Sequence, residues 1–415
     1  MSLTLPRRAL LAGTGAAAMG GALAGRSARA QARSTIRIGV LTDMSGPYRD
    51  PTGPGSVACA QQAAREFMAS HPGIAVEIVA ADHQNRADTG STIARRWYDQ
   101  DGVDMILDVP TSSVALAVAG VTRDKDKVFV NSGAATPDLY GSQCTPNTVH
   151  WTYDTQMISR TVGTALTKAG GDTWYFITAD YTFGHNLQRD TTRFVEEAGG
   201  KVVGAARYPF PSTTDFSSFL VQAQASRAKV VGLANAGADT VNAVKQAREF
   251  GLTRRAKLAT LLLAIADVHG LGLENGQGLL LTESFYWDMN ARTRAFAARM
   301  MPHMPGGLPV GMIHAGCYAG TLHYLKAVAD LGVAEARRSG RAVVERMKAM
   351  PTDDDAFGAG RIRPDGRKLH PAYLFEVKSP QESKAPFDYY KLVQTVAADE
   401  VFRPMSEGGC PLIRG

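Results

Sequence analysis

The stretch TIRIGVLTDMSGPY (residues 35–48) decides how this chain folds. Its first half is short, apolar and rich in β-branched residues, which is typical of a strand buried on both faces. The segment Ser45-Gly46-Pro47 then marks a turn, and apolar residues with helical spacing follow over 55–71. A buried strand that passes through a turn into a helix is the opening unit of an α/β fold.

The strand-then-helix alternation continues in two series along the chain. The first series has strands at 36–41, 75–80, 105–109 and 128–131, with helices at 55–71, 89–101 and 113–122. The second has strands at 173–178, 201–208, 230–234, 257–262 and 278–282, with helices at 183–198, 214–225 and 238–250. This pattern predicts two doubly wound parallel sheets with right-handed crossovers. A chain of 415 residues also exceeds what one core usually supports, so we expect two lobes.

The last part of the chain is predominantly helical and then returns to strands. Helices are expected at 293–301, 313–332 and 340–350, a short extended segment at 357–363 and a strand at 370–378. The sequence Pro364-Asp365-Gly366 marks a turn between the last two. Such an ending suits a chain that crosses back between lobes, so that each lobe is discontinuous.

Residues 1–30 are interpreted as an export signal peptide. Arg7-Arg8 precedes a weakly apolar run that ends near Leu23, and Ala28-Arg29-Ala30 resembles a cleavage site, so cleavage is expected near Ala30-Gln31. The arginine pair and the low hydrophobicity favour the twin-arginine route. The alternative of a membrane anchor is disfavoured because the run is short and glycine-rich. The segment carries four of the arginines behind the net charge of +6, so this charge does not indicate a nucleic-acid partner.

The four cysteines fall into two pairs by their surroundings. Cys59 and Cys317 lie in helical patterns and are expected to be buried small hydrophobic residues. Cys144 and Cys410 lie in loops rich in proline and glycine. Because export permits disulfides, we predict a bond between these two loop cysteines, which would tie the C-terminal tail to the connection between lobes.

Six motifs in order resemble the periplasmic Leu/Ile/Val-binding-protein-like receptors of ABC transporters. They are IRIGV with SGP (36–47), DMIL leading to two serines (104–113), SGAATP (132–137), DYTFG (180–184), AREFGL (247–252) and GLL (278–280). The resemblance covers residues 35 to about 378. It implies the type I periplasmic-binding-protein fold, in which two lobes joined by three crossings close on a small ligand. The crossings would lie near 150–154, 281–287 and 357–363. That gives an N-lobe of 34–150 plus 285–357 and a C-lobe of 151–284 plus 358–415.

Ligands of open parallel sheets bind beyond the carboxyl ends of the strands. Ser112 or Ser113 would cap the helix that follows, leaving free backbone N–H groups that suit a carboxylate. The resemblance places the carboxylate site at Ser112, Ala135 and Thr136 or their neighbours. The alternative is that these residues only cap a helix and form a turn.

The other end of the expected site departs from the amino-acid binders that the sequence resembles. The family has a tyrosine after the strand that ends near Ala234, where this chain has Asn235, and an acid that falls here on Leu261 or Leu262. Burying a ligand ammonium against leucine is costly, so a zwitterionic amino acid is disfavoured. Aromatic residues that are expected near the cleft would instead surround an apolar body, or only pack in the core or hinge. They are Tyr48, Tyr153, Phe183, Tyr286 and Trp287.

The sequence therefore predicts a monomeric receptor that captures a small organic carboxylate (an aromatic, aliphatic or hydroxy acid) and presents it to an ABC permease in the membrane. Binding of a branched-chain amino acid or an amide, and a signalling role with the same fold, are the alternatives. A hydrolase is disfavoured because the chain has no Gly-x-Ser-x-Gly motif and no histidine cluster with metal-ligand spacing. No catalytic residue, cofactor or metal is expected.

Overall fold

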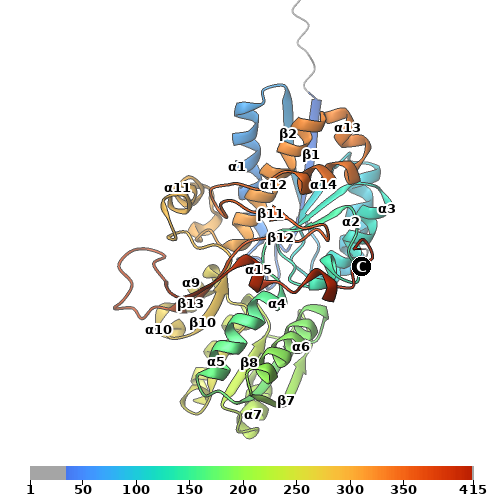
Figure 1. The fold of residues 1–415 in the computed structure, drawn as a ribbon. Helices are drawn as coiled ribbons and strands as arrows, with labels where there is room; N and C mark the ends of the chain where they lie inside the picture. Colours follow the sequence, from blue (N-terminus) through green and yellow to red (C-terminus); the bar gives the residue numbers. More distant parts are fainter. Residues whose placement is uncertain (1–33, 414–415) are drawn as a thin grey trace, which may run out of the picture. The chain divides into compact units, whose positions relative to one another are not determined.

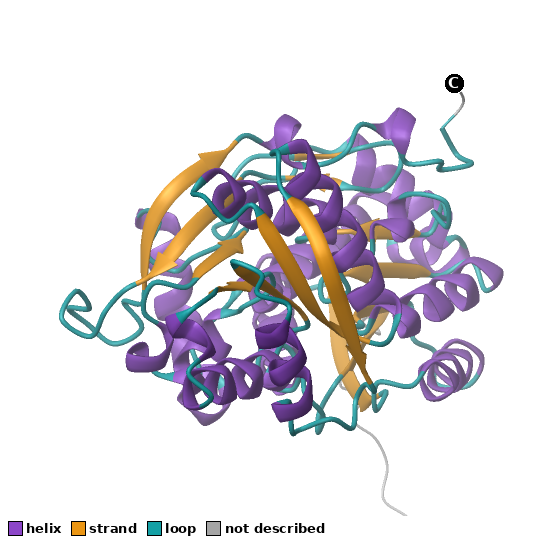
Figure 2. Cartoon of the chain, turned by 90° about the horizontal axis from the view of Figure 1, so that it is seen from below, coloured by secondary structure: helices purple, strands orange, loops and turns teal. Residues whose placement is uncertain are grey.

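The computed structural model describes residues 34–413 (Figure 1). The predicted export signal lies outside the described residues. Two parallel sheets and a smaller antiparallel sheet form the framework, so the predicted α/β class is confirmed. In Figure 2 helices flank the central strands, as expected for parallel sheets.

The first sheet is parallel and has the order β2-β1-β3-β4-β5. Its strands are β1 (Ser34–Thr42), β2 (Ile74–Asp82), β3 (Met105–Asp108), β4 (Val128–Asn131) and β5 (Thr148–His150). The opening stretch forms β1, which lies between β2 and β3, and its residues Ile36, Ile38 and Val40 are fully buried. The hydrophobic effect thus places the decisive strand inside the sheet.

Helices from both ends of the chain cover this sheet, and we call the whole the N-lobe. The helices are α1 (Gly53–Ser70), α2 (Ala87–Asp99), α3 (Ser112–Asp124), α12 (Met312–Leu331), α13 (Val333–Arg338) and α14 (Gly340–Ala349). Figure 1 shows α12, α13 and α14 in orange beside the blue β1 and α1. The late helices α12 and α13 contact α1 and β1, so a distant part of the chain completes this lobe.

The second sheet is parallel with the order β7-β6-β8-β9, and with its helices it forms the C-lobe. Its strands are β6 (Thr173–Ala179), β7 (Lys201–Tyr208), β8 (Val230–Ala234) and β9 (Lys257–Thr260). The main helices are α4 (Thr155–Ile158), α5 (Thr164–Lys168), α6 (Thr182–Glu197), α7 (Ser217–Ala225), α8 (Ala238–Glu249) and α9 (Ile265–Leu271). A π-helical segment, Ser159–Gly163, joins α4 to α5. Helix α7 begins three residues later than predicted because the Gln246 side chain bonds Thr214 and Phe216.

The third sheet is antiparallel and has the order β10-β13-β14. Its strands are β10 (Leu280–Glu283), β13 (Ala372–Val377) and β14 (Tyr390–Val396). The sequence predicted β10 as part of the parallel series, but it pairs antiparallel with β13. Strand β14 was not predicted because most of its residues are exposed, so it lacks the apolar pattern of a buried strand.

The remaining elements are short. They include α10 (Leu273–Gly276), α11 (Ala291–Met300), α15 (Ala398–Val401) and the strands β11 (Arg361–Ile362) and β12 (Lys368–Leu369). The pair β11 and β12 is antiparallel and encloses the predicted turn at Pro364-Asp365-Gly366. Within residues 34–413 no helix has the length and apolar character that a membrane crossing requires. The same residues contain no cluster of three or more His, Cys, Asp or Glu side chains suited to a metal ion.

The predicted disulfide between Cys144 and Cys410 is present, with Cα atoms 5.5 Å apart. Cys59 and Cys317 are free and buried, as expected. The chain before Cys410 runs from the third sheet towards the N-lobe, where Arg403 donates a hydrogen bond of 2.7 Å to the Pro137 carbonyl oxygen. The bond therefore fastens the C-terminal tail to the loop between β4 and β5.

Candidate ligand-binding site

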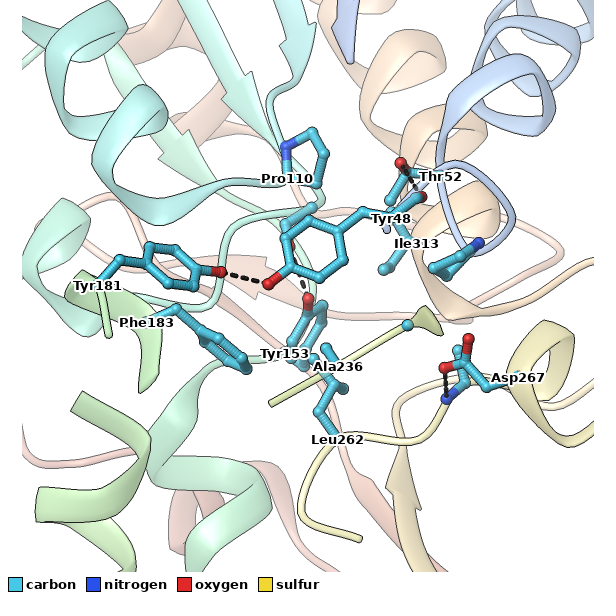
Figure 3. Close-up of a pocket in the computed structure, with 14 residues that line it drawn as sticks. Tyr48, Thr52, Pro110, Tyr153, Tyr181, Phe183, Ala236, Leu262, Asp267 and Ile313 are labelled. Carbon is cyan, nitrogen blue, oxygen red and sulfur yellow. Dashed lines mark hydrogen bonds between the residues drawn. The ribbon is translucent and has the colours of Figure 1, made fainter. Parts of the chain in front are cut away.

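A cavity lies between the two lobes, at the carboxyl ends of strands from both parallel sheets (Figure 3). Its free volume is about 20 Å³, room for about one water molecule. A larger ligand therefore requires the lobes to move apart. The fourteen lining residues are Tyr48, Pro51, Thr52, Pro110, Gly133, Tyr153, Tyr181, Phe183, Ala236, Gly237, Leu262, Ala264, Asp267 and Ile313.

Tyr48 is positioned by the turn that follows β1. The Asp43 carboxylate accepts hydrogen bonds from the backbone N–H groups of Gly46 (2.6 Å) and Tyr48 (2.9 Å), which fixes the loop. The Tyr48 hydroxyl then meets the Tyr181 hydroxyl of the C-lobe at 2.5 Å (Figure 3). Burial is the main cause that raises the pKa of both phenols, so both stay protonated. This pair joins the lobes directly beside the cavity.

A second contact between the lobes depends on glycine. The N–H of Ala238, at the start of α8, donates a hydrogen bond of 2.9 Å to the Pro47 carbonyl oxygen. Gly237 has a φ of +60°, and a Cβ atom there would lie 2.2 Å from that same oxygen. Any other residue at position 237 would therefore both strain the backbone and hold the lobes apart.

Aromatic and aliphatic side chains form most of the cavity wall. Tyr153 follows β5, and its hydroxyl donates a hydrogen bond of 2.6 Å to the Gly133 carbonyl oxygen, so its ring is fixed as a wall. Phe183 lies in the first turn of α6, and Leu262 follows β9. Such a lining suits an apolar ligand body.

Asp267 brings a carboxyl group to this apolar lining. It lies in the first turn of α9, is 4% exposed, and its Oδ2 accepts a hydrogen bond of 2.8 Å from the Ala264 N–H (Figure 3). Burial, with a smaller contribution from the charge of Asp50, raises the pKa of Asp267 to about 7. Among the fourteen lining residues, none is Lys, Arg or His, so no cation of the lining neutralises this group.

Glu283, at the end of β10, is a second buried acid near Asp267. Within the described residues, neither of its carboxyl oxygens has a hydrogen-bond partner. Burial, and then the charge of Asp267, raise the pKa of Glu283 well above its usual range. Burial therefore favours the protonated form of Glu283.

Four of the ten residues predicted to bind ligand line the cavity: Tyr48, Tyr153, Phe183 and Leu262. The other six lie outside the lining, namely Ser112, Ser113, Ala135, Thr136, Asn235 and Tyr286. Ligand contact by any of the ten stays a prediction.

The predicted helix cap by a serine is wrong. Helix α3 begins at Ser112, its N-cap residue is Thr111, and no side chain makes a capping hydrogen bond. The Thr111 hydroxyl donates to Asn85 instead. The Ser112 hydroxyl is buried and has no partner among the described residues. It lies two residues beyond Pro110, which lines the cavity.

The remaining predicted residues make structural contacts. The Ala135 carbonyl oxygen accepts from the N–H of Thr155 (3.0 Å), and the Thr136 hydroxyl accepts from the Asn186 amide (2.8 Å). Asn235 accepts a hydrogen bond of 2.7 Å from Thr240. Tyr286 packs against Phe375 and Tyr390 of the third sheet, and its hydroxyl donates to the Phe387 carbonyl oxygen at 3.1 Å.

Ten lining residues were not among the residues predicted to bind ligand. Of these, Asp267 matters most for the choice of ligand, because it brings a carboxyl group to the cavity. Asp267 lies seven residues beyond the end of β9. The family resemblance instead placed the acid at Leu261 or Leu262. The signal for Asp267 was a single acid within the apolar run LLLAIADV (261–268). The others missed are Pro51, Thr52, Pro110, Gly133, Tyr181, Ala236, Gly237, Ala264 and Ile313.

Residues 35–384 match the model of the family "Periplasmic binding protein". A crystal structure of a periplasmic binding protein from Burkholderia mallei is 44% identical, covers 92% of this chain and 100% of that chain, and has a TM-score of 0.85. A branched chain amino acid ABC transporter periplasmic ligand-binding protein from Burkholderia xenovorans LB400 is 37% identical, covers 91% and 99%, and has a TM-score of 0.77.

A curated relative is the Leu/Ile/Val-binding protein homolog 4 of Brucella abortus, 26% identical over 172 residues. That match spans 39% of this chain and 41% of the relative, so it covers about two fifths of the relative's length. The family model, the two parallel sheets and the cavity between the lobes all indicate the same family. The chain belongs to the periplasmic binding proteins, with the type I fold of the Leu/Ile/Val-binding-protein-like branch.

Proposed function

We propose that this protein is the solute receptor of an ABC transporter, which captures a small ligand between its lobes and presents the closed form to a membrane permease. The observation that carries the proposal is the pair of contacts between the lobes beside the cavity. Tyr48 meets Tyr181, and Pro47 meets Ala238. Both contacts exist only while the lobes are closed, so closure and enclosure of a ligand are coupled.

We propose that the ligand is a small organic carboxylate with an apolar body. The aromatic and aliphatic walls support the apolar part. Two features of the site support a carboxylate group at one end of the ligand. The paired hydroxyls of Tyr48 and Tyr181 use one hydrogen between them and leave the other free to donate. The unpartnered Ser112 hydroxyl lies at the N-terminus of α3, where the helix dipole favours an anion.

Asp267 limits which carboxylates fit this proposal. An ionised Asp267 repels a second carboxylate placed beside it, so the ligand's acid group would lie at the opposite, N-lobe side. The end that faces Asp267 would then carry a hydrogen-bond donor. Of the predicted ligands, a hydroxy acid meets both demands because its hydroxyl can donate to Asp267.

A branched-chain amino acid is the second candidate, and Asp267 is the observation that favours it. The carboxylate of Asp267 would pair with the ligand's ammonium group. The family's acid position falls on Leu261 or Leu262, but Asp267 supplies a carboxyl group to the cavity from a different position of this chain. The Burkholderia xenovorans relative is named for branched-chain amino acids, which is consistent with this candidate.

A thermal-shift panel followed by calorimetry separates these ligands. Matched sets would pair each acid with its hydroxy and amino derivatives of the same carbon skeleton, for example 3-methylbutanoate, its 2-hydroxy derivative and valine. A true ligand at 100 times its dissociation constant adds about 2.7 kcal/mol of stability. Stabilisation by the hydroxy acid supports the first candidate, and stabilisation by valine alone supports the second. If neutral amides bind and none of the acids does, the carboxylate proposal is wrong.

We also propose where the protein works and what it does there. Membership of the periplasmic binding proteins indicates a periplasmic protein, and we propose cleavage of the export signal near Ala30-Gln31. We further propose a monomer without catalytic activity. The proposed lobe boundaries are those predicted from the sequence, except that the tail around Cys410 is fastened to the N-lobe. Ligand-dependent stimulation of a reconstituted permease ATPase tests transport against signalling. An unchanged ligand after prolonged incubation tests the absence of catalysis.

A further inference from the structure

A groove opens at the opposite end of the C-lobe from the ligand cavity. It lies where strands of the second sheet begin, since Gly171 precedes β6, Lys229 precedes β8 and Lys257 begins β9. The ligand cavity lies at the carboxyl ends of the same strands. The groove has a volume of about 720 Å³, which is large enough for a small organic or inorganic ligand.

The groove is strongly basic. Five cationic side chains line it, and the only acid among its described lining residues is Glu376. Glu376 is already paired with Lys391 at 2.9 Å. The cations are Lys229, Arg248, Arg254, Arg255 and Lys257.

Four of the five cations lack an acidic partner that would neutralise them. Lys229 pairs with Asp172 at 2.7 Å, and the Lys257 ammonium donates weakly to the Ala169 carbonyl oxygen at 3.4 Å. The arginines of the groove form no ion pair and no side-chain hydrogen bond within residues 34–413. They are Arg248, Arg254 and Arg255.

The three arginines lie on one short stretch of chain that lines the groove. Arg248 lies in the last turn of α8, and Gly251, with a φ of +68°, reverses the chain into the short helix Leu252–Arg254. Arg254 and Arg255 are exposed, whereas the Nε atom of Arg248 is buried without an acceptor. A buried guanidinium nitrogen without an acceptor is unfavourable unless an anion supplies one.

We propose that this groove binds an anion bearing a phosphate group. Arginine forks match phosphate oxygens with two parallel hydrogen bonds, and several cations around one concave site suit a multiply charged ligand. A monocarboxylate of the kind proposed for the cleft would need only one of these groups. The phosphate could belong to a soluble solute or to a lipid headgroup, which share this chemistry.

Calorimetry with inorganic pyrophosphate, in a phosphate-free buffer of low ionic strength, tests the proposal on the whole protein. The variants are Arg248→Gln and the pair Arg254→Gln with Arg255→Gln. The matched control is Arg95→Gln, because Arg95 is an exposed arginine of α2 outside the groove. We expect each groove variant to weaken binding by about tenfold or more, since each removes a charge-assisted interaction, and the control to leave it unchanged.

Vesicles distinguish the two sources of phosphate. Co-sedimentation with phosphatidylglycerol vesicles but not with phosphatidylcholine vesicles, lost in the groove variants, supports a lipid headgroup. Pyrophosphate binding without vesicle binding supports a soluble ligand. The proposal is overturned if neither probe binds, or if binding survives in both groove variants. Far-ultraviolet circular dichroism and the melting temperature confirm that each variant is folded, so a loss of binding reports on the groove.

Discussion

Replacing Asp267 with asparagine tests how burial controls the carboxyl group that lines the cavity. Asparagine has nearly the same shape, and its side-chain oxygen can still accept the hydrogen bond that the Ala264 N–H donates to Asp267. The substitution therefore removes the ionisation of this group and little else. The free energy of unfolding is the quantity that responds.

The magnitude follows from the pKa. Burial raises the pKa of Asp267 from 3.8 to about 7, and each pKa unit corresponds to about 1.4 kcal/mol. Well below the unfolded pKa of 3.8 the group is protonated in both states. As the pH rises towards 7 the unfolded chain loses this proton first, so the folded state loses stability. Between pH 5 and pH 8 the contribution amounts to about 3 kcal/mol, and the asparagine variant lacks it.

Urea denaturation of the wild type and of Asp267→Asn, at pH 5 and pH 8, measures this difference. We expect the variant to be the more stable at both pH values, and its advantage to grow by about 3 kcal/mol between pH 5 and pH 8. Asp124→Asn is the control, because the Asp124 side chain is 64% exposed and should show no comparable change. Equal pH dependence in the wild type and Asp267→Asn would refute the argument that burial holds this proton.

Three further perturbations test closure and the tail. Gly237→Ala should weaken ligand binding at least tenfold in calorimetry, because the new Cβ atom would lie 2.2 Å from the Pro47 carbonyl oxygen and hold the lobes apart; unchanged affinity would contradict this. Tyr48→Phe removes one hydroxyl of the bond between the lobes and should weaken the free energy of ligand binding by about 1 kcal/mol. An unchanged affinity would show that closure does not need that bond. Replacing both Cys144 and Cys410 with alanine should lower the free energy of unfolding by about 2–5 kcal/mol, because the disulfide closes a loop of 266 residues. Unchanged stability in urea denaturation would refute this expectation.

The fold could be predicted from the sequence because its strands are short, buried and separated by amphipathic helices. Strand β1 is the clearest case, with Ile36, Ile38 and Val40 fully buried. The prediction failed for two strands of the third sheet. Strand β14 is mostly exposed, and β10 carries an apolar pattern that does not reveal the direction of its partner.

The candidate site could be predicted only in part, for a related reason. Tyr48 and Phe183 follow strands and turns that the sequence marks clearly. Asp267 is brought to the cavity by a helix that begins several residues after β9, and Gly237 lines it through its backbone. The position of Asp267 does not follow from counting residues beyond a strand, and Gly237 has no side chain to mark it as part of a site. The disulfide between Cys144 and Cys410 was easier, because only these two cysteines lay in loops.

In the proposed function, closure and ligand selection would depend on different groups of this protein. The contacts between the lobes beside the cavity involve the Pro47 carbonyl oxygen, the Ala238 N–H and two phenol hydroxyls, and the Asn186 amide of the C-lobe also donates to the Thr136 hydroxyl of the N-lobe. These contacts would form around any ligand small enough to be enclosed. The carboxyl group of Asp267 takes no part in them. A change at Gly237 should therefore weaken every ligand alike, whereas Asp267→Asn should change the order of preference among acids, hydroxy acids and amino acids. If both substitutions weakened all ligands equally, Asp267 would act in closure, and the assignment of the donor-bearing end of the ligand to this carboxyl group would fail.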